Sequence, residues 1–113
     1  MINRAAVILR CKEPFIRWAN EADPYYDDPG ITLEQANLER TVYLIADDAA
    51  ENLDEWLAHN FIQLFETELY SWFTDESLWP STPDKKLFDE WFDVECHSVI
   101  IDTLGGDIID DEI

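Results

Sequence analysis

Residues 53–72 carry the strongest structural signal in this sequence. Apolar side chains recur there at three- and four-residue spacing, which is the repeat of one face of an α-helix. The stripe consists of Leu53, Trp56, Leu57, Phe61, Leu64, Phe65, Leu69 and Trp72. Asp48 and Glu51 resemble a capping box that starts this helix, and the pattern ends near Phe73. Because a long helix with one apolar face must bury that face, the chain has to supply a second layer.

Three short apolar segments, at 5–11, 41–46 and 94–102, are typical of β-strands. Both faces of the segment 41–46 are mostly apolar, which favours a central strand or one covered on both sides. Further helices are predicted at 13–22, at 32–39 behind a Thr32–Gln35 capping box, and after Thr82-Pro83. The segment 25–30, with its proline and glycine, reads as a loop.

These elements predict a single α+β domain over residues 1–113. The expected architecture is a small three- to four-stranded mixed sheet with helices packed over it, a two-layer α/β sandwich. Gly105-Gly106 is a turn signal ahead of Ile108-Ile109. The segment 104–113 therefore forms either a short edge strand or a frayed acidic tail.

The charge of the chain is strongly negative and unevenly placed. The formal net charge is −19, of which residues 1–40 contribute −2 and residues 41–113 contribute −17. Such a field repels phosphate backbones and anionic lipid headgroups, so we expect neither direct nucleic-acid binding nor membrane binding. It attracts basic protein surfaces and favours solubility.

Cysteine usage and the N-terminal residues indicate a reduced, cytoplasmic protein. Cys11 and Cys96 are far apart in a chain with enough apolar residues for a core, so we expect thiols and no disulfide. The apolar run 5–9 is too short for the core of a signal peptide or for a membrane span. With three glycines and no phosphate-binding loop, no cofactor is predicted.

The densest polar and aromatic region runs from Tyr70 to His97. A cleft beside Trp79 with carboxylates at its rim would hold a basic side chain or a small cationic ligand. The alternative is that Trp79 fills the core and Asp75 caps a turn. The candidate ligand- or partner-binding residues are Trp72, Asp75, Glu76, Trp79, Asp93, Glu95 and His97.

Two carboxylate–histidine pairs suggest chemistry, but each has a structural alternative. Glu95 and His97 project from the same face of one strand and would form a general base or two metal ligands. Otherwise they form a structural pair, or Glu95 bridges to Arg10 or Lys12. Glu55 and His59 are one helical turn apart, but a zinc site needs three or four ligands, so no metal is predicted.

Two stretches, YSWFTDESLW at 70–79 and EWFDVECHS at 90–98, resemble a family of small acidic bacterial proteins of unknown function. The segments Lys12–Phe15 and Thr41–Ile45 share the resemblance, which covers most of the chain. It implies a bacterial, intracellular, stand-alone domain and assigns no activity or catalytic residue. The double glycine and the acidic tail after Asp102 are the expected departures.

Two functional hypotheses follow. The first is a non-enzymatic protein-interaction module that binds basic protein surfaces, with a nucleic-acid mimic as a special case. The alternative is a small enzyme or ligand-binding protein that uses a polar-aromatic pocket near Trp79 and His97. Because a small sheet has edges, the protein is a monomer or a homodimer, and any interface should use the less acidic N-terminal part.

Overall fold

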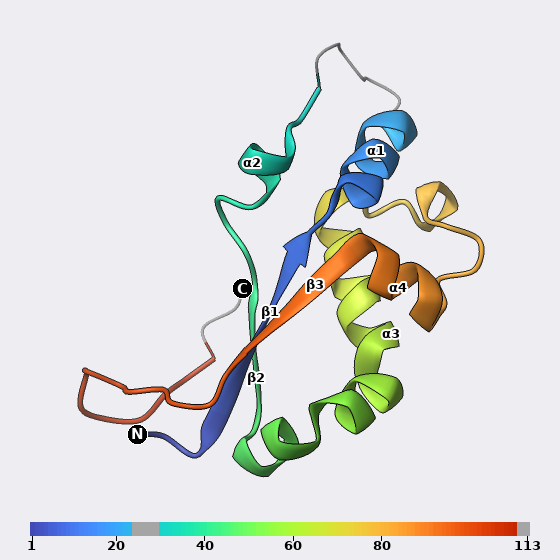
Figure 1. Ribbon diagram of the computed structural model, residues 1–113. Helices are drawn as coiled ribbons and strands as arrows, with labels where there is room; N and C mark the ends of the chain where they lie inside the picture. Colours follow the sequence, from blue (N-terminus) through green and yellow to red (C-terminus); the bar gives the residue numbers. More distant parts are fainter. Residues whose placement is uncertain (24–29, 111–113) are drawn as a thin grey trace.

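The computed structural model describes residues 1–23 and 30–110, which form a three-stranded antiparallel sheet covered on one face by helices (Figure 1). The predicted loop at 25–30 lies outside the described residues except for Gly30, as do residues 111–113 of the tail. The strands are β1 (Arg4–Cys11), β2 (Val42–Ala46) and β3 (Phe92–His97). The helices are α1 (Glu13–Ala22), α2 (Leu33–Ala36), α3 (Leu53–Trp72) and α4 (Lys85–Trp91), with short 3-10 turns η1 (Asp47–Asn52) and η2 (Glu76–Leu78).

Local sequence signals fix most of these boundaries. Pro14 lies in the first turn of α1, where its missing N–H is harmless. The Thr32–Gln35 capping box forms as predicted, although α2 is shorter than expected and ends at Ala36. Asp84, rather than Thr82, caps α4 by accepting from the Leu87 N–H. The predicted capping region at Asp48 forms η1, and α3 begins at Leu53.

The α+β class and the layer of helices over a small sheet are confirmed. The strand order is β2-β1-β3, and both pairs are antiparallel, so the parallel pair that a mixed sheet requires does not form. The reason lies in the connections. The segment with α1 and α2 leaves β1 at Cys11 and comes back to the same residue, because the Asn37 side chain accepts from the Cys11 N–H at 2.9 Å. Strand β2 therefore starts beside the end of β1 and runs in the opposite direction. Likewise, the Lys12 N–H donates to the Trp91 carbonyl at 2.8 Å where β3 begins.

The expectation that 41–46 is a central strand or covered on both sides is wrong. Strand β1 is central, and β2 lies at the edge, with Val42 and Leu44 exposed by 54% and 49%. Its apolar residues belong to two different environments: Tyr43 and Ile45 pack toward the helices, whereas Val42 and Leu44 face outward. Residues 104–110 form no strand, so the described part of the tail does not extend the sheet.

The core lies between the inner face of the sheet and helices α1, α3 and α4. Phe15 of α1 is fully buried, and its ring contacts Trp18, Trp72, Trp91 and Phe92 at centroid distances of 5.0 to 5.6 Å. Phe15 therefore lies at the centre of an aromatic cluster in the core. From β3, Val94 and Cys96 pack toward this core, so the intervening Glu95 and His97 point to the outer face.

Candidate functional site

The predicted cleft beside Trp79 exists as a groove along the outer surface of α3, with a volume of about 500 Å³. It is lined by Ile62, Gln63, Glu66, Thr67, Tyr70 and Trp79. Ile62, Glu66 and Tyr70 are four residues apart, so they form one ridge on the helix surface. Ile62 is 41% exposed and Tyr70 is 60% exposed, so the groove offers apolar and aromatic surface to a ligand.

Trp79 forms a fixed wall of this groove. Its indole N–H donates to the Phe73 carbonyl at 2.8 Å, and the ring packs partly against the core. The connection that carries Trp79 is itself held to α1, because the Trp18 indole donates to the Leu78 carbonyl at 3.1 Å. Trp79 therefore combines both readings of the sequence: one part of the ring fills the core and another lines a groove.

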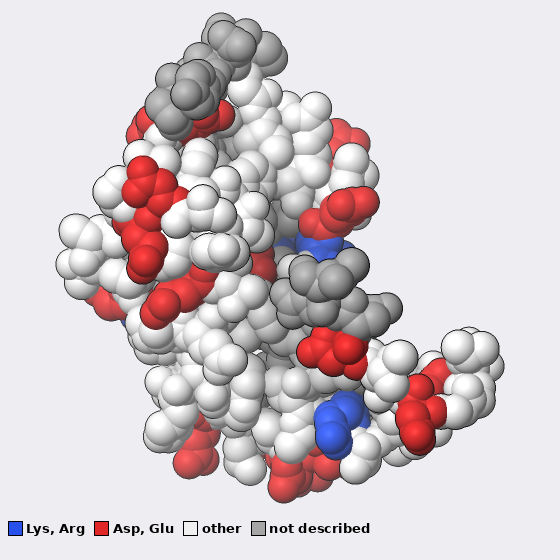
Figure 2. Space-filling view, turned by 180° about the vertical axis from the view of Figure 1, so that it is seen from behind, with Lys and Arg blue, Asp and Glu red and all other residues white. Residues whose placement is uncertain are grey.

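The electrostatic character of the groove is set by α3, which contains Asp54, Glu55, Glu66 and Glu68 but no lysine or arginine. Glu66 is the carboxylate within the groove itself, and it is exposed. Figure 2 shows one face of the molecule, on which carboxylates are spread among uncharged side chains and few basic groups appear. The groove therefore favours a cationic over an anionic ligand.

The acidic residues next to Trp79 in the sequence do not line this groove. Asp75 caps η2, where its carboxylate accepts from the Ser77 backbone N–H at 3.0 Å and from the Ser77 hydroxyl at 2.6 Å. The hydroxyl bond is the main cause that lowers the pKa of Asp75. Glu76 is exposed in η2, and Trp72 packs edge-on against Phe15 at 5.6 Å. Asp75 therefore caps a turn, which was the structural alternative to a role in ligand binding.

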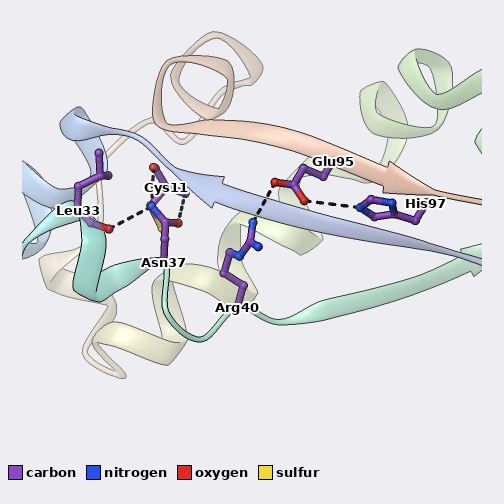
Figure 3. A network of polar contacts seen from close by, with 6 residues as sticks. All are labelled: Cys11, Leu33, Asn37, Arg40, Glu95 and His97. Atoms are coloured by element: carbon purple, nitrogen blue, oxygen red, sulfur yellow. Dashed lines mark hydrogen bonds and ion pairs between the residues drawn. The ribbon is translucent and has the colours of Figure 1, made fainter.

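Glu95 and His97 lie together on the outer face of the sheet, and Arg40 binds Glu95 there (Figure 3). The Arg40 guanidinium donates to Glu95 Oε1 at 3.0 Å, and His97 Nε2 lies 3.6 Å from Glu95 Oε2. The Arg40 bond is the main cause that lowers the pKa of Glu95. The expected contact between Glu95 and His97 forms, but the expected bridge from Glu95 to Arg10 or Lys12 is wrong, because Arg40 is its cationic partner. Lys12 pairs instead with Asp93 at 3.4 Å.

The structure separates the two halves of the candidate residue set. Trp72 and Trp79 belong to the helical layer, whereas the pair Glu95 and His97 occupies the opposite, outer face of β3. The side chain of His97 is 61% exposed, and Glu95 is already bound to Arg40. Trp79 and His97 therefore lie on opposite sides of the sheet and do not share a pocket.

The second carboxylate–histidine pair does not form a side-chain ligand pair. His59 Nδ1 lies 2.9 Å from the backbone carbonyl of Glu55, in a shallow hollow of about 330 Å³ at the start of α3. Within residues 1–23 and 30–110, no three His, Cys, Asp or Glu side chains are placed to hold a metal ion. The cysteines described here are thiols: Cys11 is buried and Cys96 is partly buried.

Sequence reasoning missed Ile62, Gln63, Glu66 and Thr67, which line the groove. The spacing of apolar residues along α3 contained a signal for this surface. Ile62 is apolar but falls outside the buried stripe of α3, and Tyr70 repeats its position two turns later. Apolar residues that leave the main stripe at regular helical spacing mark a second, exposed contact surface.

Searches against protein-family models, curated proteins and solved structures found no match to this chain. The resemblance to small acidic bacterial proteins therefore stays a prediction. Among the described helices, none combines the length and apolar character needed to cross a bilayer. By its fold and groove, the molecule is a small α+β protein with an acidic, aromatic-lined helix surface.

Proposed function

We propose that this protein is a non-enzymatic protein-interaction module that binds a basic, amphipathic segment of a partner protein. The single observation that carries the proposal is the groove on α3 and Trp79. It combines exposed apolar surface with a carboxylate on a helix that has no lysine or arginine. A partner segment would place an apolar side chain between Tyr70 and Trp79 and a lysine or arginine beside Glu66.

The shape of the groove supports an extended contact rather than enclosure of a small molecule. The ridge Ile62–Glu66–Tyr70 spans two helical turns, or about 12 Å of helix axis. This length matches the spacing of anchor residues on an amphipathic helix that lies in a groove. Glu66 and the wider field of the chain, with its net charge of −19, would mainly accelerate the encounter with a basic partner.

The test uses a fluorescein-labelled peptide with leucine and lysine in an amphipathic helical repeat, titrated with the full chain and followed by fluorescence anisotropy. A matched peptide with glutamate in place of lysine is the control. We expect saturable binding of the lysine peptide only. The affinity should fall by at least about tenfold from roughly 50 mM to 500 mM salt, because screening weakens exposed charge interactions.

Two variants locate the binding surface. Glu66→Lys and Tyr70→Ala should each lower the affinity for the lysine peptide by about tenfold, a loss of about 1.4 kcal/mol in binding free energy. Glu34→Lys changes the net charge by the same amount as Glu66→Lys but lies on α2, away from α3 in Figure 1. It should have a much smaller effect.

Equal losses for Glu66→Lys and Glu34→Lys would mean that the peptide responds to net charge alone, which would contradict the groove as the site. Binding of the glutamate peptide would contradict the electrostatic basis of the proposal. Circular dichroism of each variant verifies that the fold is intact.

A further inference from the structure

The outer edge of β2 is open in the part of the chain that the structure describes. Its inner edge pairs with β1 over the register from Arg4–Ala46 to Ile8–Val42. No backbone group of β2 hydrogen-bonds to a described residue outside this sheet. Val42 and Leu44 of this strand are also exposed by 54% and 49%. An edge strand with unpaired N–H and C=O groups is a template for another strand.

This edge lacks the usual protection against pairing. Proteins commonly block edge strands with charged residues, proline or a bulge. The strand Val42–Ala46 has the sequence VYLIA, which contains no charge and no proline. The opposite edge strand, β3, carries Asp93, Glu95 and His97 on its outer face. The uncharged edge is therefore confined to β2.

We propose that a second copy of this chain pairs antiparallel with β2, so that two three-stranded sheets join into one six-stranded sheet. Centring the pair on Leu44 uses the whole strand: Leu44 faces Leu44 of the other copy, and Val42 faces its Ala46. Every contact in such a two-fold interface occurs twice, except the central Leu44–Leu44 contact, which lies on the axis. Six strands is an ordinary size for a sheet.

The charges that flank β2 favour a second copy in this orientation. Arg40 lies two residues before the strand, and Asp48 lies two residues after it. Antiparallel pairing about Leu44 brings Arg40 close to the η1 turn of the other copy, which carries Asp48, at both ends of the interface. A parallel arrangement would set like charges together. In the single chain the Arg40 guanidinium donates to Glu95 on β3 at 3.0 Å, so pairing with a carboxylate of the other copy requires that it exchange partners.

The same features predict how strong the association is. A contact made by one five-residue strand buries less surface than a typical stable interface of about 1,600 Å², so the dimer is weak. Each copy also carries a net charge of −19, which opposes association at a distance. Screening should therefore tighten the dimer as salt increases. Peptide binding in the α3 groove should respond to salt in the opposite direction, so the two proposals fail independently.

Sedimentation velocity of the full chain tests the proposal over about 10 µM to 1 mM protein, at low and at high salt. We expect reversible formation of a dimer that is favoured at high salt. Leu44→Lys should weaken the dimer by at least tenfold, because it places two like charges opposite each other at the centre of the interface. Leu104→Lys, at an 80% exposed position in the tail, is the matched control and should leave the dimer intact.

A charge-matched pair of variants tests the orientation. Asp48→Lys and Glu34→Lys reduce the net negative charge equally, but Asp48→Lys also places a lysine close to Arg40 of the other copy at each end of the interface. We therefore expect Asp48→Lys to dimerise several-fold more weakly than Glu34→Lys. Equal dimerisation of the two variants would overturn the antiparallel register.

Cysteine cross-linking provides a readout that does not depend on the stability of the lysine variants. In a Cys96→Ser background, Leu44→Cys should form an intermolecular disulfide under mild oxidation. Leu104→Cys, at an 80% exposed tail position, should form far less. A wild-type chain that stays monomeric up to the highest concentration would overturn the proposal. So would a dimer that neither cross-links through position 44 nor responds to Leu44→Lys.

Discussion

Tyr43 on β2 donates its phenolic O–H to the carboxylate of Glu68 on α3, and this hydrogen bond joins the sheet to the long helix. Glu68 is only 9% exposed, and it is the buried charged residue of the described chain. Burial raises the pKa of Glu68, while the bond from Tyr43 opposes that rise. Burial is also the main cause that raises the pKa of Tyr43, and its bond to Glu68 adds to the rise. The pair is a polar link within an apolar layer.

The raised pKa of Glu68 predicts a specific pH dependence of stability. An unfolded glutamate ionises near pH 4.3, whereas the folded carboxyl ionises at higher pH. Between these values the folded chain holds a proton that the unfolded chain has lost, so raising the pH lowers the free energy of unfolding. Glu68→Gln should remove the energetic cost of ionising a buried carboxyl. It should raise the free energy of unfolding at pH 7 by on the order of 1 kcal/mol and the melting temperature by about 4 °C.

Urea denaturation of both proteins between about pH 4 and pH 7 measures this difference. The gain from Glu68→Gln should shrink as the pH falls toward the unfolded value. Glu66→Gln, an exposed change on the same helix, controls for the loss of one surface charge and should show a much flatter difference. A gain that is constant with pH would contradict the assignment to Glu68.

Tyr43→Phe should destabilise the protein, because it removes the donor to a buried carboxylate and leaves that group without its partner. We expect a loss of about 1–3 kcal/mol in the free energy of unfolding, larger at neutral pH, where the charged form of Glu68 is the costly one. Chemical denaturation at the two ends of the pH range measures the effect. Tyr70→Phe, at an exposed position, should change stability little.

Asn37 acts as an extension of the sheet. Its side-chain amide accepts from the Cys11 N–H at 2.9 Å and donates to the Cys11 carbonyl at 3.2 Å, beyond the last pair of β1 with β2 (Figure 3). Asn37→Ala should leave both backbone groups unpaired and cost about 1–3 kcal/mol. Hydrogen exchange should show faster exchange of the Cys11 amide. Unchanged protection there would show that Asn37 does not hold this end of β1.

The two thiols should differ in reactivity. Burial is the main cause that raises the pKa of Cys11 to about 11, so only about one thiol in a thousand is ionised at pH 8. Cys96 is partly exposed on β3. A thiol reagent should therefore modify Cys96 first in the native protein, and both cysteines once the chain is unfolded. Rapid modification of Cys11 in the folded protein, read by mass spectrometry, would contradict its burial.

The candidate site was predicted only in part, and the reason lies in how local each signal is. The sequence indicated a groove at Trp79, because functional sites tend to lie on short loops that rigid elements position. It could not identify Glu66 as the carboxylate there, since which side of α3 meets Trp79 depends on how the connection 73–79 folds back. The expected partner of Glu95 was wrong for a similar reason: its partner Arg40 is 55 residues away in the sequence, and only the folded chain brings the two together.

The sequence by itself determined the type and approximate place of the main elements: apolar spacing produced the helix 53–72, and the Thr32–Gln35 capping box starts α2. It did not determine where each element ends, since β3 stops at His97 and not at the expected residue 102. Only the tertiary structure decided that the sheet is antiparallel, that β2 lies at its edge, and that Glu95 and His97 face away from Trp79. The physical reason is that helix periodicity and caps act within a few residues. Strand order and facing depend on contacts between segments far apart in the chain, such as the Asn37 link that returns β2 to the end of β1.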